Sequence, residues 1–341
     1  MECLKYIQLE HQQWDEYIAK IEGSTFSYTS VKINFDVEYS LFLKENESMI
    51  LLEDNQPIAA VILYIEEDNG TYSVSWSKGY VPVPVIHQGL TYKQQEKIMK
   101  KSLEYIEKIA GKYGCQSILL RFDPLVNPAN TSKLYNYNVL LKEQYQDKST
   151  LTQMIDLRQE EKILRSEIRK GHKSDIKRGC CQITFYDKDN ITESIIEEYK
   201  RIYELDAGKV TRNSEMYMHY YNFVKAGEGL VALANCEGEN VAVLIATLYK
   251  DTAYYSSYAE LTEQLQGKPA GHQLQWNTIL ELKQRGIAFY EIGEQVFGEY
   301  PRGSEEAKLV NISAFKRGFG GYTTAMFRGE KIFGKNEKRV K

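Results

Sequence analysis

The residues best suited to chemistry lie near the end of the chain, in the stretch Ala314-Phe-Lys-Arg-Gly-Phe-Gly320. Lys316 follows Phe315 directly and precedes Phe319 by three positions, just before a run of glycines. A preorganised cation stabilises the negative charge that builds on a carbonyl oxygen when an amine attacks an ester, an effect of about 3 kcal/mol. The alternative is structural: the stem of a surface lysine packs between two rings and its amine reaches solvent.

Other candidate groups are less specific. Glu294 follows Glu291-Ile-Gly293, where the second predicted sheet should splay and open its cleft, so it is a candidate to orient or deprotonate an incoming amine. Asp206 ranks below it, because lone carboxylates near strand ends are commonly structural. His272 precedes a predicted helix and is either a base or a packing residue at the cap. No Ser-His-Asp or Cys-His set has a defensible spacing.

Length and composition limit the classes of protein. A chain of 341 residues suits two domains of about 150 residues each. No apolar run approaches the roughly 20 residues that span a bilayer, and the N-terminus lacks a signal-like pattern, so we expect a cytoplasmic protein. The formal net charge of -4 argues against a surface that binds nucleic acid all over, but allows a local basic patch.

The cysteines show no metal-binding pattern. There is no CxxC motif and no histidine at metal spacing. Neighbouring cysteines rarely bond to each other, and a cytoplasmic chain usually keeps its thiols reduced. We therefore expect no metal and no disulfide among the five cysteines, which are Cys3, Cys115, Cys180, Cys181 and Cys236.

The same order of elements occurs twice, about 180 residues apart: strand, turn, strand, turn, strand, helix, glycine, strand. In the first half these are strands at 48–53, 58–65 and 71–76, a helix that includes 98–110, and a strand at 116–122. In the second half they are strands at 229–236, 241–249 and 252–258, a helix at 273–285 and a strand at 287–292. This repetition predicts an α/β fold of two similar domains, each a mixed, mostly antiparallel sheet flanked by helices.

We place the domains at 1–157 and 158–327, with strand 151–157 closing the first and a basic helix at about 160–178 opening the second. Residues 328–341 form a tail that returns towards the first domain, although its basic end, 335–341, is expected to be disordered. The basic helix is either a solvated face or a trap for a phosphate-rich partner. Its cations are Lys162, Arg165, Arg169, Lys170, Lys173, Lys177 and Arg178.

Several segments together resemble the FemABX family of peptidyltransferases. The likeness rests on Leu120-Arg-Phe-Asp-Pro124, on Ile155-Asp-Leu157 with the basic helix ending at Gly179, on Thr211-Arg212 before Tyr217 to Tyr221, on Leu274-Gln-Trp276 with 286–293, and on 314–320. It covers nearly the whole chain and implies two tandem acetyltransferase-like (GNAT) domains. It also implies transfer of an aminoacyl group from aminoacyl-tRNA to an amine of a nucleotide- or lipid-linked peptidoglycan precursor, with no cofactor or metal, and tRNA contact through the basic helix.

The resemblance also implies roles for single residues. The lysine matching Lys316 lies between donor and acceptor, and the arginine matching Arg212 contacts the diphosphate of the acceptor, which suits a planar group with several donors. Lys32 is a loose match to an aromatic-lysine segment near the first strand, and Val81-Pro-Val-Pro84 replaces an Arg-Gly-Pro segment, so the acceptor is left open. The other expected substrate-binding residues are Tyr217, Tyr255, Tyr258 and Phe315.

A GNAT-type N-acyltransferase that uses acyl-CoA on an amino sugar or another cell-surface precursor amine is the competing interpretation. Such enzymes bind pyrophosphate on the amides of a glycine-rich loop that opens a helix. The first half lacks this loop at 85–91, and in the second half Gln264 and Gly267 are followed by Pro269, which removes an amide. We therefore favour a donor other than CoA. A third interpretation is a non-catalytic binding protein on a degenerate GNAT fold.

Overall fold

The computed structural model describes residues 2–261, 267 and 269–333. The chain divides into two compact units, which we describe separately. Unit 1 comprises Met1–Thr150 and Ala325–Lys341, and unit 2 comprises Leu151–Thr324. None of the helices in the described part of the chain has the length and apolar character that a bilayer span requires.

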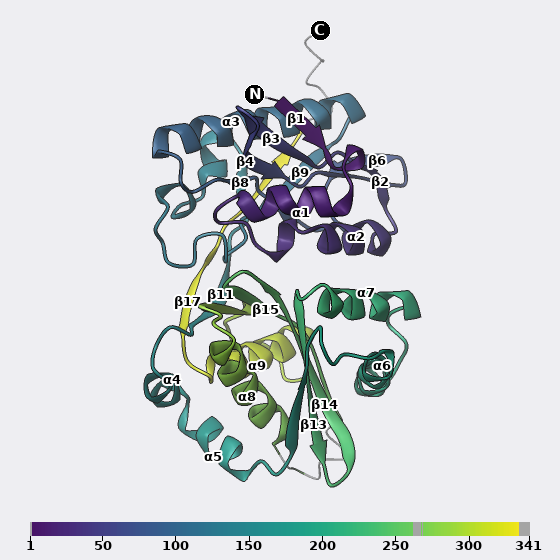
Figure 1. Cartoon of the computed structure of the whole chain (residues 1–341), viewed down its shortest axis with the longest axis vertical. Helices are drawn as coiled ribbons and strands as arrows, with labels where there is room; N and C mark the ends of the chain where they lie inside the picture. The colour runs from purple at the N-terminus through teal and green to yellow at the C-terminus, as the bar shows by residue number, and fades with distance from the viewer. Residues whose placement is uncertain (1, 262–266, 268, 334–341) are drawn as a thin grey trace. The chain divides into compact units, whose positions relative to one another are not determined.

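The described residues of unit 1 form two sheets and three α-helices. One sheet has the order β1-β3-β4-β8, and the other the order β10-β18-β9-β6-β5-β2, with β7 beside β9. The strands are β1 (Glu2–Lys5), β2 (Leu43–Asn46), β3 (Met49–Glu53), β4 (Gln56–Val61), β5 (Tyr64–Asp68), β6 (Thr71–Val74), β7 (Val81–Pro82), β8 (Val85–Ile86), β9 (Ser117–Arg121), β10 (Gln146–Asp147) and β18 (Arg328–Ile332). The helices are α1 (His11–Lys20), α2 (Ser30–Tyr39) and α3 (Tyr92–Tyr113) (Figure 1).

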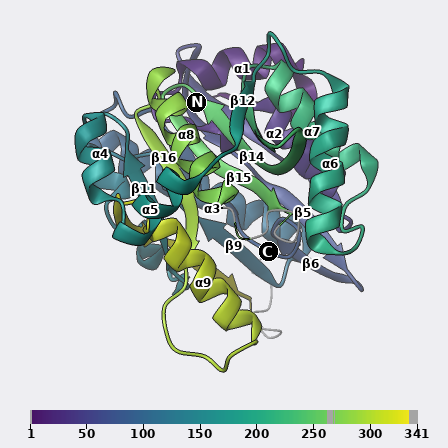
Figure 2. The ribbon, with the colours of Figure 1, turned by 90° about the horizontal axis from the view of Figure 1, so that it is seen from below.

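Unit 2 is built on one seven-stranded sheet of order β12-β13-β14-β15-β16-β11-β17. The strands are β11 (Thr150–Asp156), β12 (Gln182–Tyr186), β13 (Gly229–Cys236), β14 (Glu239–Tyr249), β15 (Thr252–Glu260), β16 (Phe289–Gln295) and β17 (Tyr322–Met326). The helices are α4 (Glu161–Glu167), α5 (Lys170–Arg178), α6 (Glu193–Ala207), α7 (Ser214–Lys225), α8 (Ala270–Gln284) and α9 (Glu305–Arg317). Helices α6 and α7 lie on one side of the sheet and α8 on the other (Figures 1 and 2).

The repeated plan is present in both units. In unit 1, β6 is followed by the short strands β7 and β8 and by α3 before the chain enters β9, which is parallel to β6. In unit 2, α8 connects β15 to the parallel strand β16. The sequence sets the limits of α3 clearly: Thr91 and Gln94 form a capping box, and Gly114 ends the helix in a left-handed conformation. The predicted fold class, two α/β domains with mixed sheets flanked by helices, is confirmed.

The strand predicted at 151–157 is not the last strand of the first domain. It forms β11, which pairs antiparallel with β16 inside the sheet of unit 2, where Met154 and Ile155 are buried. The corresponding strand of unit 1 is β18, which comes from the end of the chain and pairs antiparallel with β9. The tail therefore does return to unit 1 as far as Phe333, whose amide donates to the carbonyl of Gln116. The prediction for 335–341 lies outside the described residues.

The single basic helix predicted at 160–178 is wrong, because two helices, α4 and α5, occupy this segment. Between them Ile168 and Arg169 adopt extended backbone angles, so the helical hydrogen bonding is interrupted. Ile168 is buried in the core of unit 2, and the amide of Arg169 donates to the carbonyl of Gly318 at 2.9 Å. Tertiary contacts at the break therefore outweigh the local helical preference.

Candidate active site

The sheet of unit 2 parts between β15 and β16. The two strands pair in parallel from Thr252 and Phe289 to Tyr254 and Glu291 and then pair no further, although both strands continue. Both strands are also irregular here, with a register shift against β14 beside Tyr255 and one against β11 beside Gly293. Bulges of this kind re-aim side chains and are frequent beside active sites. The sequence led us to expect the sheet to splay at this position.

Lys316 reaches this parting from the last turn of α9. The helix begins at the cap Ser304, whose hydroxyl accepts from the amide of Ala307 at 3.1 Å, and it ends with the two bases Lys316 and Arg317. The Nζ atom of Lys316 lies 4.8 Å from the centroid of the Tyr255 ring on β15. Such a contact between an ammonium and an aromatic face is attractive.

Gly293 on β16 allows the close approach of this lysine. Its φ angle is +103°, in the left-handed region, and a Cβ atom at this position would collide with Nζ of Lys316. The backbone conformation therefore favours glycine here, and any larger residue would also displace the end of the Lys316 side chain. Gly293 stands inside a strand pattern where glycine is otherwise unfavourable, and this is a weak signal that the position is special.

The ammonium of Lys316 is held in a partly desolvated position under the influence of two acids. Burial lowers the pKa of Lys316 below the ordinary lysine value, while Glu291 and Glu294 oppose this shift. The two acids differ: Glu291 is buried and accepts a hydrogen bond from the hydroxyl of Thr152, whereas Glu294 is exposed. Of the two, Glu294 is the carboxylate that a solvent-borne amine can reach.

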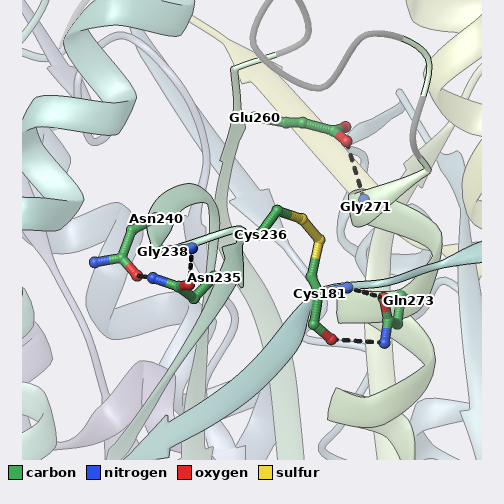
Figure 3. The surroundings of a disulfide bond; sticks show 8 residues. All are labelled: Cys181, Asn235, Cys236, Gly238, Asn240, Glu260, Gly271 and Gln273. Carbon is green, nitrogen blue, oxygen red and sulfur yellow. Dashed lines mark hydrogen bonds between the residues drawn. A yellow bond between two sulfur atoms is a disulfide. The ribbon is translucent and has the colours of Figure 1, made fainter.

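Tyr255 and Tyr258 continue the site along β15. Their rings stack at 6.2 Å, and burial raises the pKa of both phenols well above the ordinary value, so both stay protonated donors near neutral pH. The hydroxyl of Tyr258 donates to Oε2 of Glu260 at 2.5 Å, and Oε1 of Glu260 accepts from the amide of Gly271 at 3.0 Å. Glu260 thereby links this strand to the first turn of α8 (Figure 3). No sequence signal pointed to Glu260.

Phe315 is next to Lys316 in the sequence, but its ring does not flank the Lys316 ammonium. Its ring packs against Phe319 at 5.2 Å and against the two histidines His172 and His272, at 5.5 and 5.0 Å. The ring near the ammonium is that of Tyr255. Adjacent residues on a helix point in different directions, so Phe315 faces the α5 and α8 side while Lys316 faces the parted strands.

The two histidines belong to this aromatic cluster. His172 is buried on α5 and its Nε2 bonds the carbonyl of Phe315 at 2.9 Å, while Nε2 of His272 lies 3.5 Å from Oδ2 of Asp175. Burial lowers the pKa of His272 to about 4, assisted by the neighbouring His172 and opposed by Asp175. His272 is therefore neutral near pH 7. His172 carried no signal that sequence reasoning could use.

Arg212 lies in the segment between α6 and α7, and Tyr217 lies on α7; both contact tyrosine rings. The guanidinium of Arg212 stacks 4.0 Å from the Tyr203 ring and donates to the hydroxyl of Tyr199, which also bonds the hydroxyl of Ser257 on β15. Tyr217 is only 1% exposed and its ring contacts those of Tyr199 and Tyr203. The structure thus places Arg212 and Tyr217 together. Asp206 is exposed in the last turn of α6.

Lys32 belongs to unit 1. It forms an ion pair with Asp36 one turn along α2, and its Nζ lies 4.6 Å from the Trp76 ring centroid and 5.2 Å from that of Phe35. Burial lowers the pKa of Lys32, and Asp36 opposes this shift. The lysine is therefore set among aromatic rings, and its expected role in substrate binding stays a prediction.

The expectation that all cysteines stay reduced is wrong. Cys181 and Cys236 form a disulfide in unit 2 (Figure 3). The two residues are 55 apart in sequence, but they stand opposite each other at adjoining ends of β12 and β13, with Cα atoms 4.4 Å apart. That proximity depends on strand pairing, which cysteine spacing does not reveal.

The comparisons with known proteins agree with this architecture. The family model of an acetyltransferase (GNAT) domain matches residues 162–308. FemX is similar in structure at a TM-score of 0.68 and 12% identity, with 98% of each chain covered. L-PGS from Bacillus licheniformis has a TM-score of 0.54 at 12% identity, with 91% of this chain and 93% of that chain covered.

A tandem GNAT protein from the clavulanic acid biosynthesis pathway has a TM-score of 0.53 at 10% identity, with 98% of this chain and 99% of that chain covered. A search of curated protein sequences finds no significant match. The fold expected from the FemABX resemblance is confirmed. The chain shares its fold with FemX and with the tandem GNAT protein, and residues 162–308 match an acetyltransferase (GNAT) domain.

Proposed function

We propose that this chain is an aminoacyltransferase that moves an aminoacyl group from aminoacyl-tRNA to an amine of a nucleotide- or lipid-linked peptidoglycan precursor. The observation that carries the proposal is the position of Lys316, a desolvated ammonium set where the strands of unit 2 part, between Tyr255 and Gly293. The fold shared with FemX supports the class of reaction.

The reaction follows from the charges at this site. The acceptor amine attacks the carbonyl carbon of the aminoacyl ester, and negative charge builds on the carbonyl oxygen. The ammonium of Lys316 stabilises that charge, an effect that is large in a partly dry site. The exposed carboxylate of Glu294 orients the amine and takes the proton that it loses. The ester bond then breaks, the ribose oxygen leaves and takes the proton that Glu294 accepted, and an amide remains on the acceptor.

The first turn of α8 supports a donor other than CoA. In an acyl-CoA enzyme this helix start would offer its amides to a pyrophosphate. Here Pro269 at the cap has no amide hydrogen, and the amide of Gly271 already donates to the carboxylate of Glu260. A carboxylate at this place repels a second anion. Gln264 of the predicted loop lies outside the described residues.

The basic surface of α4 and α5 fits the tRNA donor. The segment that forms α4 and α5 carries exposed cations at Lys162, Arg165, Arg169, Lys170, Lys177 and Arg178. Such a group attracts a phosphate backbone without regard to base sequence. Arg212 is a candidate to bind the acceptor phosphates. Its guanidinium stacks on Tyr203 and uses one N–H donor for the hydroxyl of Tyr199, so the phosphates would bind its other donors.

An acyl-CoA N-acyltransferase acting on a cell-surface precursor amine is the second candidate, because the family model that matches 162–308 describes an acetyltransferase. The deciding experiment is a reconstituted assay with tRNA charged with a radiolabelled amino-acid mixture and a UDP-linked muropeptide as acceptor. We expect labelled acceptor that RNase treatment abolishes. Transfer that ignores RNase and requires acetyl-CoA would replace our proposal with the second candidate. A thermal shift with CoA but none with the muropeptide would point the same way.

A further inference from the structure

Three cysteines of unit 2 form a compact sulfur cluster. The Sγ atoms of Cys180, Cys181 and Cys236 all lie within 4.8 Å of one another. Cys181 and Cys236 are bonded and are only 6% and 7% exposed, whereas Cys180 keeps a free thiol and is exposed. The cluster therefore combines a buried disulfide with an accessible free thiol whose Sγ atom lies within 4.8 Å of both bonded sulfurs.

The buried bridge fastens the start of an edge strand. Strand β12 pairs on one side with β13, and the amide and carbonyl of Cys181 bond the side chain of Gln273 on α8, at 3.0 and 2.8 Å. On the other strand Cys236 leads into the turn where Asn235 accepts from the amide of Gly238 at 3.0 Å (Figure 3). A reductant in solvent thus meets a bridge enclosed by β12, β13 and α8.

We propose that Cys180 is the exchange thiol of a redox site that opens the Cys181–Cys236 bridge to small dithiols. The thiolate of Cys180 attacks Sγ of Cys236, a Cys180–Cys236 bond forms, and the Cys181–Cys236 bond breaks. Cys181 leaves as a thiolate and takes a proton from water, so the oxidation state of the protein does not change. Cys236 is the target because a bond between the neighbours Cys180 and Cys181 is disfavoured by their adjacency in the chain.

The exchanged bridge includes the exposed sulfur. One thiolate of a small dithiol attacks Sγ of Cys180, which gives a mixed disulfide and releases Cys236 as a thiolate. The second thiolate of the dithiol then attacks the dithiol sulfur that is bonded to Cys180. This closes the cyclic disulfide and releases Cys180 as a thiolate. The dithiol is oxidised to a cyclic disulfide by two electrons, and the protein gains two thiols. Cys180 thus acts as a relay between solvent and a bridge that solvent does not reach.

The test measures how fast the bridge is reduced in the native protein. Wild type and Cys180→Ser are treated with dithiothreitol, quenched with an alkylating reagent over time, digested and analysed by mass spectrometry. We expect the substitution to slow the loss of the Cys181–Cys236 bridge at least about tenfold, because reduction then waits for local opening. In denaturant both proteins should react at the same rate. Cys3→Ser, which removes the other exposed thiol, should react like wild type.

A second readout follows the intermediate directly. In wild type with no dithiol, alkylation should find a fraction of molecules with a Cys180–Cys236 bond and a modified Cys181. Equal native reduction rates for wild type and Cys180→Ser, or no such intermediate, would overturn the proposal. It would also be overturned if the reduced protein bound one Zn²⁺ through all three thiolates and did not re-form the bridge on reoxidation, since that is the behaviour of a metal site.

Discussion

The Nζ atom of Lys316 on α9 lies 4.8 Å from the centroid of the Tyr255 ring on β15, at the point where β15 and β16 cease to pair. A strand, a helix end and Gly293 on the neighbouring strand thus meet at one ammonium. Burial at this position lowers the pKa of Lys316, which means that placing the charged side chain here is unfavourable for folding. A buried charge with a lowered pKa at the opening between two strands is typical of a functional site.

Replacing Lys316 by methionine should remove turnover and leave acceptor affinity nearly unchanged. The ammonium is proposed to act on charge that exists only in the transition state, so its loss should lower kcat by about 100-fold or more. Folding should not suffer. Because burial lowers the pKa of Lys316 in the folded chain, the unfolded chain binds this proton more tightly near neutral pH, and removing the charge keeps or raises Tm.

The matched control is Lys308→Met, an exposed lysine on the same helix. It should keep both turnover and Tm. Steady-state kinetics and thermal unfolding of the two variants separate the effects. If Lys316→Met retained wild-type kcat, the proposed catalytic role would be lost, whereas a large fall in Tm would show that the lysine is a packing residue.

Replacing Gly293 by alanine should destabilise the protein by about 1–3 kcal/mol through its left-handed backbone, with an added cost from collision with Lys316. Gly303→Ala is the control, because its φ is +91° and a Cβ atom there meets nothing within 4 Å. Urea unfolding of both variants gives the difference. The double variant Gly293→Ala, Lys316→Ala should recover the part due to collision; no recovery would mean that the ammonium yields freely.

Much of the fold was predictable because its signals are local. Turn residues between apolar runs predicted β3, β13 and β14, and helical periodicity ending at a glycine predicted α3 and α8. The return of the end of the chain to unit 1 as β18 was predicted, but the place of β11 in the sheet of unit 2 was not predictable, because a short apolar strand between the two halves fits either sheet equally well. Likewise, the break at Ile168 depends on burial against a core that only the folded chain provides.

The site was predictable in part for the same reason. Lys316 could be singled out from its neighbours in sequence, and Glu294 from its position after a strand. The contact between Lys316 and the Tyr255 ring could not be predicted, because it depends on a bulge in β15 that no local sequence pattern encodes. Glu260 acquires its role only from the start of α8, and the pairing of Cys181 with Cys236 only from strand register.

Removing the basic surface of α4 and α5 should weaken binding of tRNA. The change replaces four exposed cations by glutamine: Lys162, Arg165, Lys170 and Lys177. Each lost phosphate contact should reduce the slope of log K against log salt by about 0.7 to 0.9, so the variant should bind at least tenfold more weakly at low salt. Fluorescence anisotropy with labelled tRNA at several salt concentrations measures both quantities.

The control for this surface neutralises four exposed lysines of α3, which lies in unit 1: Lys93, Lys97, Lys100 and Lys101. This variant has the same net charge as the first. It should keep most of the affinity and of the salt slope. Equal losses in the two variants would mean that tRNA responds to net charge alone and that α4 and α5 are not its binding surface.

The pair His172 and His272 should make the protein sensitive to acid. Burial lowers the pKa of His272 to about 4, below its ordinary value of 6.5, and lowers that of His172 as well. Between these values the unfolded chain binds the proton and the folded chain does not, so stability is lost as pH falls from 6.5 towards 4. For His272 the loss is about 2 kcal/mol at pH 5.

His272→Phe keeps a ring against Phe315 and should remove most of this loss, whereas a change at the exposed His11 should not. Urea unfolding at pH 7 and pH 5 measures the difference, and an unchanged acid sensitivity in His272→Phe would assign the effect to other groups.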